Sequence, residues 1–339
     1  MIHYKKIIIT NLPSFYKINL YNRINMHQKI FLIFTGDTAA LRKNDFFSGE
    51  IEFDFISLEN YSIIRKLKII FNIIKRYNYD ELIICGVNEL TSWLCAFISP
   101  YYKNSTVVES SYHEATVTGL KGFLKKIFFK RISVTYASGV SQEKLTRLLK
   151  FKGKVIVTKG VGIFNIIKQP QFKPSVIVKD FIYVGRLSPE KNLVFLIEVF
   201  NKLKNINLHI IGYGPQEGLL KKIAKDNTFF YGAVENKKLP EMYQRCNVFI
   251  LPSAKEPWGL VVEEALNNGL PVIVSNKVGC AEEIIEEDHN GLIFEFNSFT
   301  SLLGTITKMS DIAYYNNLKL NVSKLNFNLI ADYQVNCYL

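Results

Sequence analysis

The amino-acid sequence predicts an α/β protein built from two tandem, Rossmann-like, doubly wound domains that face each other across a cleft. Three observations lead to this prediction: the chain has 339 residues, short apolar strands alternate with helices, and this alternation starts again near residue 180. A chain of this length exceeds what one hydrophobic core usually serves. Alternating strands and helices form parallel sheets covered on both faces, and ligands bind beyond the carboxyl ends of such strands.

The first domain is predicted over residues 1–168. Short apolar runs predict its strands at 6–10, 31–35, 53–57, 81–85 and 106–109. The stretch 164–180 is loosely patterned and contains Pro170 and Pro174, which indicates a linker.

The second domain is predicted over residues 169–315. Its expected strands lie at 180–184, 208–211, 228–231, 248–251, 272–274 and 292–294. Helices are expected between them at 193–203, 217–225, 240–245, 260–268 and 281–286. Residues 316–339 are weakly patterned, and we expect this segment to pack back on the first domain.

The composition is that of a folded protein, with 48% hydrophobic and 21% charged residues. Disordered, collagen-like and coiled-coil classes are therefore excluded. The five cysteines form no C-x-x-C pair, so neither a disulfide framework nor a four-cysteine zinc site is expected. No signal peptide or membrane span is predicted. Together these features lead us to expect a cytoplasmic protein.

The positive charge is confined to the first half. Residues 1–168 hold 25 Lys and Arg against 12 Asp and Glu, a net charge of +13, whereas residues 169–339 have a net charge of −1. A field of this sign attracts polyanions such as nucleic acid, an anionic membrane leaflet or phosphorylated substrates. The cations concentrate in two segments, residues 63–79 and 120–132.

The segment 120–132 has the pattern of a basic amphipathic helix. Its apolar residues follow helical spacing, and cations lie between them. Such a helix can lie on a membrane surface, or it can face a core and expose a solvated basic side. The charge of the whole half favours an anionic membrane surface over nucleic acid, for which no motif is evident. The expected membrane-surface residues are Lys121, Phe123, Lys125, Lys126, Lys130 and Arg131.

The first site segment, residues 183–192, is a strand end, a tight turn and a helix start. Gly185 and Arg186 follow the strand, and Lys191 stands at the helix start. Two cations beside free backbone N–H groups suit a diphosphate. The alternative is a pair of surface cations at a turn.

The second segment, residues 211–218, places Gly212 and Gly214 after a strand. Glycines there allow a ligand to approach the backbone closely. The pattern is similar to a dinucleotide fingerprint, but its third glycine, Gly218, is one position late. Glu235 lies where a ribose-binding acid could follow. An NAD(P)-dependent oxidoreductase is therefore an alternative, although no such fingerprint follows the first strand.

The third segment, residues 251–266, is a strand end followed by a helix that begins near Gly259. Free N–H groups at Gly259 and Leu260 would point at an anion. Glu256 lies just ahead of the helix, and Glu264 shares a face with its first turn. Both carboxylates are suited to bind sugar hydroxyls. The fourth segment, residues 269–294, is predicted as strand, glycine turn, short helix and strand.

In their order and spacing, these four segments resemble the carboxyl-terminal domain of the retaining glycosyltransferases of the GT-B fold, family 4, also called glycosyl transferases group 1. The resemblance covers residues 180–296. It matches Glu256 and Glu264 to the family's E-x7-E pair, and Arg186 and Lys191 to its basic pair.

The resemblance implies a role for each residue in binding the nucleotide-sugar donor. Arg186 and Lys191 would hold the diphosphate, with backbone contacts from Gly259 and Leu260. Glu264 would bind the ribose and Glu256 the transferred sugar. The nucleobase would pack at Val234.

In the first half, residues 10–17 are similar to the opening of polysaccharide-assembly members of this family, but without the glycine-rich first loop of many others. This similarity suggests Pro13, Tyr16 and Lys17 for the acceptor side. Family members often place a histidine at the cleft, and His113 is the candidate because it follows a predicted strand. The alternative is a histidine on a surface loop.

The resemblance implies transfer of a sugar from a nucleotide-diphosphate sugar to a hydroxyl of a glycan acceptor, with retention of anomeric configuration. Cations and helix amides would stabilise the leaving diphosphate. Since the sequence contains no D-x-D pair, we expect no metal and no other cofactor. The basic first half suggests a lipid-linked acceptor for surface polysaccharide such as O-antigen or capsule, on the inner face of a bacterial membrane. A non-catalytic sugar-nucleotide-binding protein is a further alternative.

Overall fold

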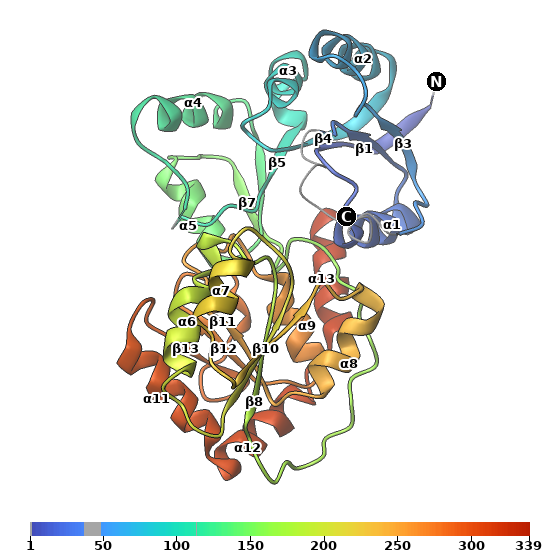
Figure 1. Cartoon of the computed structure of the whole chain (residues 1–339). Helices are drawn as coiled ribbons and strands as arrows, with labels where there is room; N and C mark the ends of the chain where they lie inside the picture. Colours follow the sequence, from blue (N-terminus) through green and yellow to red (C-terminus); the bar gives the residue numbers. More distant parts are fainter. Residues whose placement is uncertain (1, 37–48, 113) are drawn as a thin grey trace. The chain divides into compact units, whose positions relative to one another are not determined.

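A computed structural model describes residues 2–36, 49–112 and 114–339. The chain divides into two compact units (Figure 1). Unit 1 comprises the residues up to Phe164 together with Asn328–Leu339, and unit 2 comprises Asn165–Phe327. Among the described residues, no helix combines the length and the apolarity needed to cross a membrane.

Unit 1 contains a seven-stranded parallel sheet in the order β3-β2-β1-β4-β5-β6-β7. The central strand β1 pairs in parallel with both β2 and β4. Its residues Ile7, Ile8 and Ile9 are fully buried, as expected for a parallel strand with helices on both faces. The strands are β1 (His3–Thr10), β2 (Ile30–Phe34), β3 (Asp54–Ser57), β4 (Asn78–Cys85), β5 (Asn104–Val108), β6 (Val134–Ala137) and β7 (Lys154–Val157).

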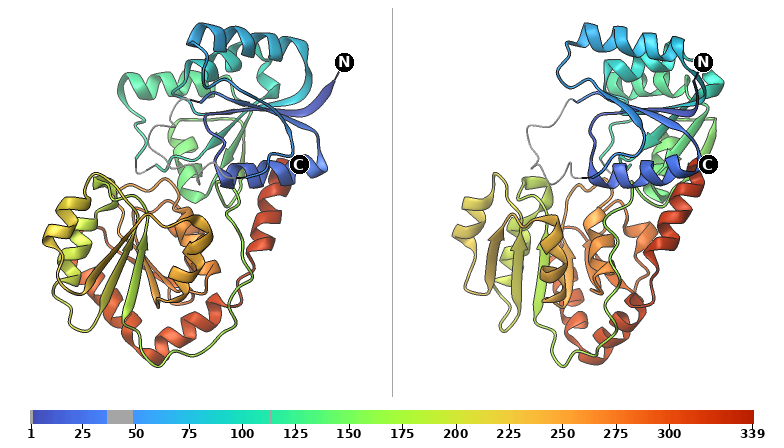
Figure 2. Two further views of the ribbon diagram at one scale, coloured as in Figure 1. Left: turned by 45° about the vertical axis from the view of Figure 1, so that its right-hand side comes forward. Right: turned by 90° about the vertical axis from the view of Figure 1, so that its right-hand side faces the viewer.

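Helices cover both faces of this sheet. One face carries α2 (Ile63–Arg76), α3 (Leu90–Ile98), the 3-10 turn η3 (Tyr101–Lys103), α4 (Gly119–Phe129) and α5 (Val140–Leu148). Their apolar sides form one core with the sheet, which includes Ile70, Cys95, Phe128 and Leu145. The opposite face carries α1 (Phe15–His27) and the C-terminal α13 (Phe327–Tyr338), as Figure 2 shows.

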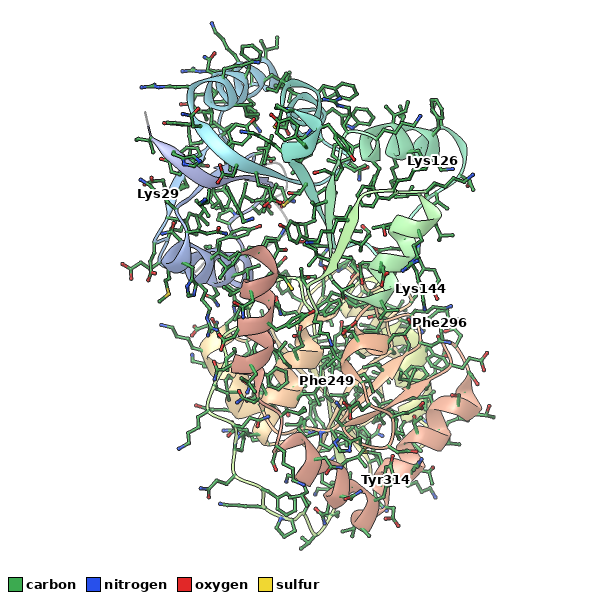
Figure 3. The ribbon with its side chains drawn as sticks, turned by 180° about the vertical axis from the view of Figure 1, so that it is seen from behind. Lys29, Lys126, Lys144, Phe249, Phe296 and Tyr314 are labelled. Atoms are coloured by element: carbon green, nitrogen blue, oxygen red, sulfur yellow. The ribbon has the colours of Figure 1, made fainter. Side chains whose placement is uncertain are left out.

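Unit 2 contains a six-stranded parallel sheet in the order β10-β9-β8-β11-β12-β13. The strand order reverses between β8 and β11, as in nucleotide-binding doubly wound folds. Phe249, labelled in Figure 3, lies on the fully buried strand β11. The strands are β8 (Asp180–Val184), β9 (Asn207–Ile211), β10 (Thr228–Gly232), β11 (Val248–Leu251), β12 (Val272–Ser275) and β13 (Gly291–Phe294).

Short helices follow the strands of unit 2. The 3-10 turns are η4 (Pro189–Lys191) and η5 (Asn236–Lys238). The α-helices are α6 (Leu193–Phe200), α7 (Glu217–Ile223), α8 (Leu239–Gln244), α9 (Leu260–Asn267), α10 (Ala281–Ile284), α11 (Phe299–Ser310) and α12 (Ile312–Val322).

The prediction of two parallel, doubly wound α/β sheets is confirmed, and each predicted strand is present. Two strands, β6 and β7, were not predicted. Strand β6 includes Thr135 and Tyr136, and the edge strand β7 has only the short apolar run 155–157 after the exposed Lys154, so both strands have weak signals in the sequence. The boundary between the units follows Phe164 rather than residue 168, and the returning C-terminal segment starts at Asn328 rather than residue 316, since α12 is part of unit 2.

The returning helix α13 is held to unit 1 by aromatic stacking. The ring of Tyr338 lies 4.4 Å from that of Tyr136, with 24° between the ring planes. Both rings are buried. We expect Tyr338→Ala to lower the free energy of unfolding of unit 1 by about 3 kcal/mol, because it removes a buried aromatic side chain.

Urea unfolding followed by circular dichroism would measure this loss. The exposed Asn336 on the same helix provides the control, and Asn336→Ala should change stability by less than about 0.5 kcal/mol. Equal effects of the two substitutions would contradict the packing role of Tyr338.

Candidate active site

The candidate site of unit 2 lies where the strand order of its sheet reverses. Strands β8 and β11 are direct neighbours, with Val248 paired to Phe181 and Phe249 to Ile182. The chain leaves β8 through Gly185 and leaves β11 through Pro252. Ligands of doubly wound sheets bind at this position. The predicted residues from both segments are therefore brought to one edge of the sheet.

An ion pair joins the two loops. The ammonium of Lys191 bonds to carboxylate oxygen Oε2 of Glu256, and both side chains are largely shielded, at 17% and 12% exposure. Ser253 Oγ also donates to this oxygen at 3.2 Å. The backbone N–H of Ala254 donates to the carbonyl of Glu190 at 2.8 Å. The loops after β8 and β11 therefore form one connected wall.

Glu264 lies on α9, and its carboxylate is held by a tyrosine. The hydroxyl of the buried Tyr243 donates to Glu264 Oε2 at 3.4 Å. Burial raises the pKa of Glu264 to about 7. This carboxyl group is therefore able to accept hydrogen bonds from ligand hydroxyls or, once protonated, to donate one.

A second buried carboxyl, that of Glu263, was not predicted from the sequence. Trp258 Nε1 donates to Glu263 Oε2 at 2.8 Å, and both side chains are buried. Burial raises the pKa of Glu263 to about 8. The pair joins the loop before α9 to the first turn of that helix. A tryptophan ahead of a helix and a glutamate on the helix's apolar side are the signal in the sequence.

The N-terminus of α9 is fixed by close backbone packing. Its N-cap, Gly259, has φ +105°, a conformation that favours glycine. The N–H groups of Gly279 and Cys280 donate to the carbonyls of Glu256 and Trp258, each at 2.9 Å. The N–H groups of the first turn, from Gly259 and Leu260 onward, are the donors that a helix leaves for an anion.

The glycines after β8 and β9 allow two loops to meet. A Cβ atom on Gly212 would lie 1.8 Å from the carbonyl oxygen of Gly185, and one on Gly214 would lie 2.3 Å from that of Leu187. Backbone hydrogen bonds join the loops, from Gly185 to the carbonyl of Ile211 at 3.0 Å. These glycines therefore shape the loop that carries Arg186 and Lys191.

The structure also tests the two residues on which the dinucleotide hypothesis depends, Gly218 and Glu235. A Cβ atom on Gly218 would meet no heavy atom of the described residues within 4 Å, whereas the third fingerprint glycine is needed for close packing of helix on strand. Glu235 is exposed and pairs with Lys238 at 3.4 Å. The open space around Gly218 therefore disfavours an NAD(P) fingerprint in unit 2.

The other predicted residues are placed as follows. Arg186 is exposed at the end of β8, and its carbonyl accepts a hydrogen bond from the hydroxyl of Tyr183 at 2.8 Å. Val234 is half-buried in the turn after β10. His113 lies outside the described residues. Among the described residues, no cluster of three or more His, Cys, Asp or Glu side chains could hold a metal ion.

Unit 1 has a cavity of about 200 Å³ at the corresponding reversal, between the ends of β1 and β4. Lys17 lines it and pairs with Glu109 at 3.0 Å. Although burial disfavours its charge, Glu109 holds the pKa of Lys17 above its usual range. Pro13 and Tyr16 are half-buried at the start of α1.

Comparisons with known proteins show which family and which folds this chain is similar to. Residues 167–321 match the family model "Glycosyl transferases group 1", which spans nearly all of unit 2. An uncharacterized glycosyltransferase of Methanocaldococcus jannaschii is 31% identical over 185 residues, 49% of this chain and 47% of that protein. An uncharacterized protein in the cps region of Klebsiella pneumoniae is 26% identical over 224 residues, 66% of this chain and 52% of that protein. The chain thus spans about half the length of these curated relatives.

Solved structures extend the similarity to both units. Sucrose-phosphate synthase from Thermosynechococcus elongatus superposes with a TM-score of 0.73 at 18% identity, covering 98% of each chain. The chain has the GT-B fold. The lipopolysaccharide outer core galactosyltransferase WaaB gives 0.72 at 13% identity over 98% of each chain. HepE of Anabaena, solved with UDP and glucose, gives 0.69 at 16% identity over 97% of each chain. At these identities the likeness establishes the GT-B fold alone.

The glycine geometry predicts opposite effects for two alanine substitutions. Gly212→Ala should lower the free energy of unfolding by at least about 2 kcal/mol, because its Cβ would collide with backbone. Gly218→Ala should raise it by about 0.5 kcal/mol, since α7 gains a better helix former in open space. Thermal unfolding measures both. A loss at Gly218 as large as that at Gly212 would instead support the dinucleotide hypothesis.

The buried carboxyl of Glu263 predicts a pH-dependent stability. In the unfolded state this carboxyl loses its proton above its usual pKa of about 4.3, whereas in the folded state it keeps the proton up to about pH 8. The free energy of unfolding that depends on Glu263 therefore falls as pH rises toward 8. The neutral Glu263→Gln should make the fall in stability between about pH 5.5 and 7 shallower by about 1.4 kcal/mol per pH unit. Urea midpoints across this range measure the slope.

Glu241→Gln is the matched control for this substitution, because Glu241 is exposed on the neighbouring helix α8. This variant should keep the wild-type slope. If Glu263→Gln also kept it, Glu263 would be ionised in the folded protein and the assigned protonation would be wrong.

Proposed function

We propose that this protein is a glycosyltransferase that moves a sugar from a nucleotide-diphosphate sugar to a hydroxyl of a glycan acceptor. The observation that carries the proposal is the Lys191–Glu256 ion pair beside the N-terminus of α9, at the strand reversal of unit 2. One group of this pair suits phosphate and the other suits sugar hydroxyls. The match of unit 2 to glycosyl transferases group 1 supports the same activity.

Donor binding would separate Lys191 from Glu256, and each side chain would then contact a different part of the donor. The donor's diphosphate would take Lys191 from Glu256, and the released carboxylate would accept a hydrogen bond from the transferred sugar. Arg186 and the N–H groups of Gly259 and Leu260 would complete the phosphate contacts. Glu264 would bind the ribose hydroxyls, and the nucleobase would pack at Val234.

In the transfer step, the bond between the anomeric carbon and the diphosphate oxygen breaks, and a bond to the acceptor oxygen forms. The proton of the acceptor hydroxyl is transferred to a diphosphate oxygen or to water. Negative charge grows on the nucleoside diphosphate, and the cations and amides that already face it stabilise this charge. We propose that they do so without a metal or other cofactor, and that the sugar keeps its anomeric configuration.

We place the acceptor in bacterial surface polysaccharide synthesis and take it to be lipid-linked. The relative in the cps region of Klebsiella pneumoniae and the structural likeness to the lipopolysaccharide galactosyltransferase WaaB support this choice. The net charge of +13 over residues 1–168 also fits an anionic surface. The cavity with Lys17 is the proposed acceptor side, and the inner face of the cell membrane is the proposed location.

Two substitutions in the ion pair test this function. Lys191→Met should weaken binding of a nucleoside diphosphate about 10- to 100-fold, because a charge-assisted contact is lost. Binding of the nucleoside alone should change little. Glu256→Gln should bind the diphosphate within a few-fold of wild type but release it from a nucleotide sugar about 100-fold more slowly. Calorimetry with UDP, GDP, uridine, guanosine and NADH measures binding, and nucleoside diphosphate release measures turnover.

Lys204→Met is the control, because Lys204 is exposed and lies outside the site. It should behave as wild type. Binding of NADH alone would overturn the proposal in favour of an oxidoreductase. Binding of a nucleotide sugar without turnover, even with glycan acceptors supplied, would indicate a sugar-nucleotide-binding protein.

A further inference from the structure

Four elements of unit 1 present an outer surface that is both basic and apolar. They are α2, α3, η3 and α4, and we call their solvent-facing side the basic apolar face. None of the four contains an acidic residue over its described range. Figures 1 and 2 show α2, α3 and α4 side by side on one face of the sheet.

Helices α2, α3 and α4 form one layer, in which α2 contacts α3 and α3 contacts α4. The ring of Trp93 on α3 lies 6.1 Å from that of Phe97 on the same helix and 5.7 Å from that of Phe128 on α4. Arg131, just after α4, donates to the carbonyls of Ala96 at 3.1 Å and Ser99 at 3.3 Å. Arg131 was expected to meet a membrane, but its hydrogen bonds show that it joins α4 to α3.

Large apolar side chains project from this layer. Ile64 on α2 is 78% exposed, Tyr102 on η3 73%, Leu120 on α4 74% and Phe123 on α4 60%. Scattered exposed apolar residues are ordinary, but a concentration of them on one face marks an interaction surface. The further exposed members are Ile63, Phe71, Leu90, Phe97, Tyr101 and Leu124.

Exposed cations lie on the same elements as these side chains. Lys68 on α2, together with Lys121 and Lys130 at the two ends of α4, is exposed. Lys126, labelled in Figure 3, is half-buried on α4. Lys125 points differently: it lines the cavity of unit 1, and burial lowers its pKa. The cations available to a partner therefore include Lys68, Lys121 and Lys130.

We propose that the basic apolar face docks on the surface of an anionic lipid bilayer. Its aliphatic and aromatic side chains would enter the headgroup region, and its lysines would contact anionic headgroups. Exposed aliphatic residues such as Ile64 and Leu120 favour lipid over nucleic acid, because single strands bind by stacking on aromatic rings. The full absence of acidic residues from the four elements supplies the charge complementarity.

The face is continuous with the cavity of unit 1. Lys125 and Phe129 of α4 line this cavity, while Leu120 and Phe123 of the same helix point to solvent. One helix would therefore separate the lipid surface from the proposed acceptor side. This inference rests on the proposed function for its purpose, since a lipid-linked acceptor would then be presented beside the cavity.

Sedimentation of the full chain with vesicles tests the docking. We expect binding to phosphatidylcholine vesicles that contain phosphatidylglycerol, and little binding to phosphatidylcholine alone. Because salt at about 1 M shortens the screening length to about 3 Å, the electrostatic part of this binding should be lost there. The assay contains no sugar nucleotide, so its outcome is independent of donor binding, which calorimetry reports separately.

Variants separate the two parts of the face. The double substitution Lys68→Glu with Lys121→Glu should weaken binding to anionic vesicles at least about 30-fold. Each cation near the membrane surface contributes about fivefold to this binding. The matched control, Lys204→Glu with Lys222→Glu, has the same change of net charge on unit 2 and should bind as wild type. Leu120→Ser with Phe123→Ser should also lose binding, whereas Val176→Ser with Leu219→Ser, at exposed sites of unit 2, should not.

The proposal is overturned if wild type ignores anionic vesicles at low salt, or if either control pair loses as much binding as its matched pair on the face. It is also overturned if single-stranded DNA binds through the same lysines while vesicles do not, because the face would then serve nucleic acid. Circular dichroism of each variant confirms that it is folded, and all eight substituted side chains are exposed.

Discussion

The reversal of strand order in the two parallel sheets is the constraint on which the rest of this structure depends. In each sheet, two neighbouring strands send their following helices to opposite faces, so their carboxyl ends open into a gap that no helix fills. In unit 2 this gap holds the ion pair and the N-terminus of α9. In unit 1 it holds the cavity with Lys17. The charged groups assigned to the donor and to the acceptor side are positioned by this topology.

Close backbone contact then gives the site of unit 2 its shape. The loops after β8 and β9 meet at Gly185 and Gly212, and the loops after β11 and β12 meet at Pro257 and Gly279, where a Cβ would lie 1.8 Å from a carbonyl oxygen. Such contacts leave little freedom to the segments that carry the cations and carboxylates. The site is therefore preorganised by its backbone, and its side chains contribute charge to a frame that is already fixed.

Much of this arrangement could be predicted from the sequence, because its signals are local. Apolar runs marked the strands, and the glycines, cations and acids after them marked the loops of unit 2. The pairing of Lys191 with Glu256 could not be predicted, since 65 residues separate them and only the sheet order brings them together. Glu263 was missed because a glutamate on a helix is usually solvated, although the tryptophan ahead of α9 and the place of Glu263 on the apolar side of that helix could have indicated their contact. Strand β7 was missed because its apolar run is limited to residues 155–157 and follows the exposed Lys154.

The Lys191–Glu256 ion pair also bears on selectivity. Without a ligand, Lys191 and Glu256 neutralise each other. A simple anion that bound Lys191 would leave the shielded carboxylate of Glu256 without its cation and with the hydroxyl of Ser253 as its hydrogen-bond partner, which is costly. Inorganic phosphate would gain a contact with Lys191 but would break the contact between Lys191 and Glu256. A molecule that brings both an anion and a hydroxyl group restores both halves of the pair at once. In the proposed function, Glu256 would therefore compete with small phosphates for Lys191 and would favour a ligand that carries both a phosphate and a hydroxyl group.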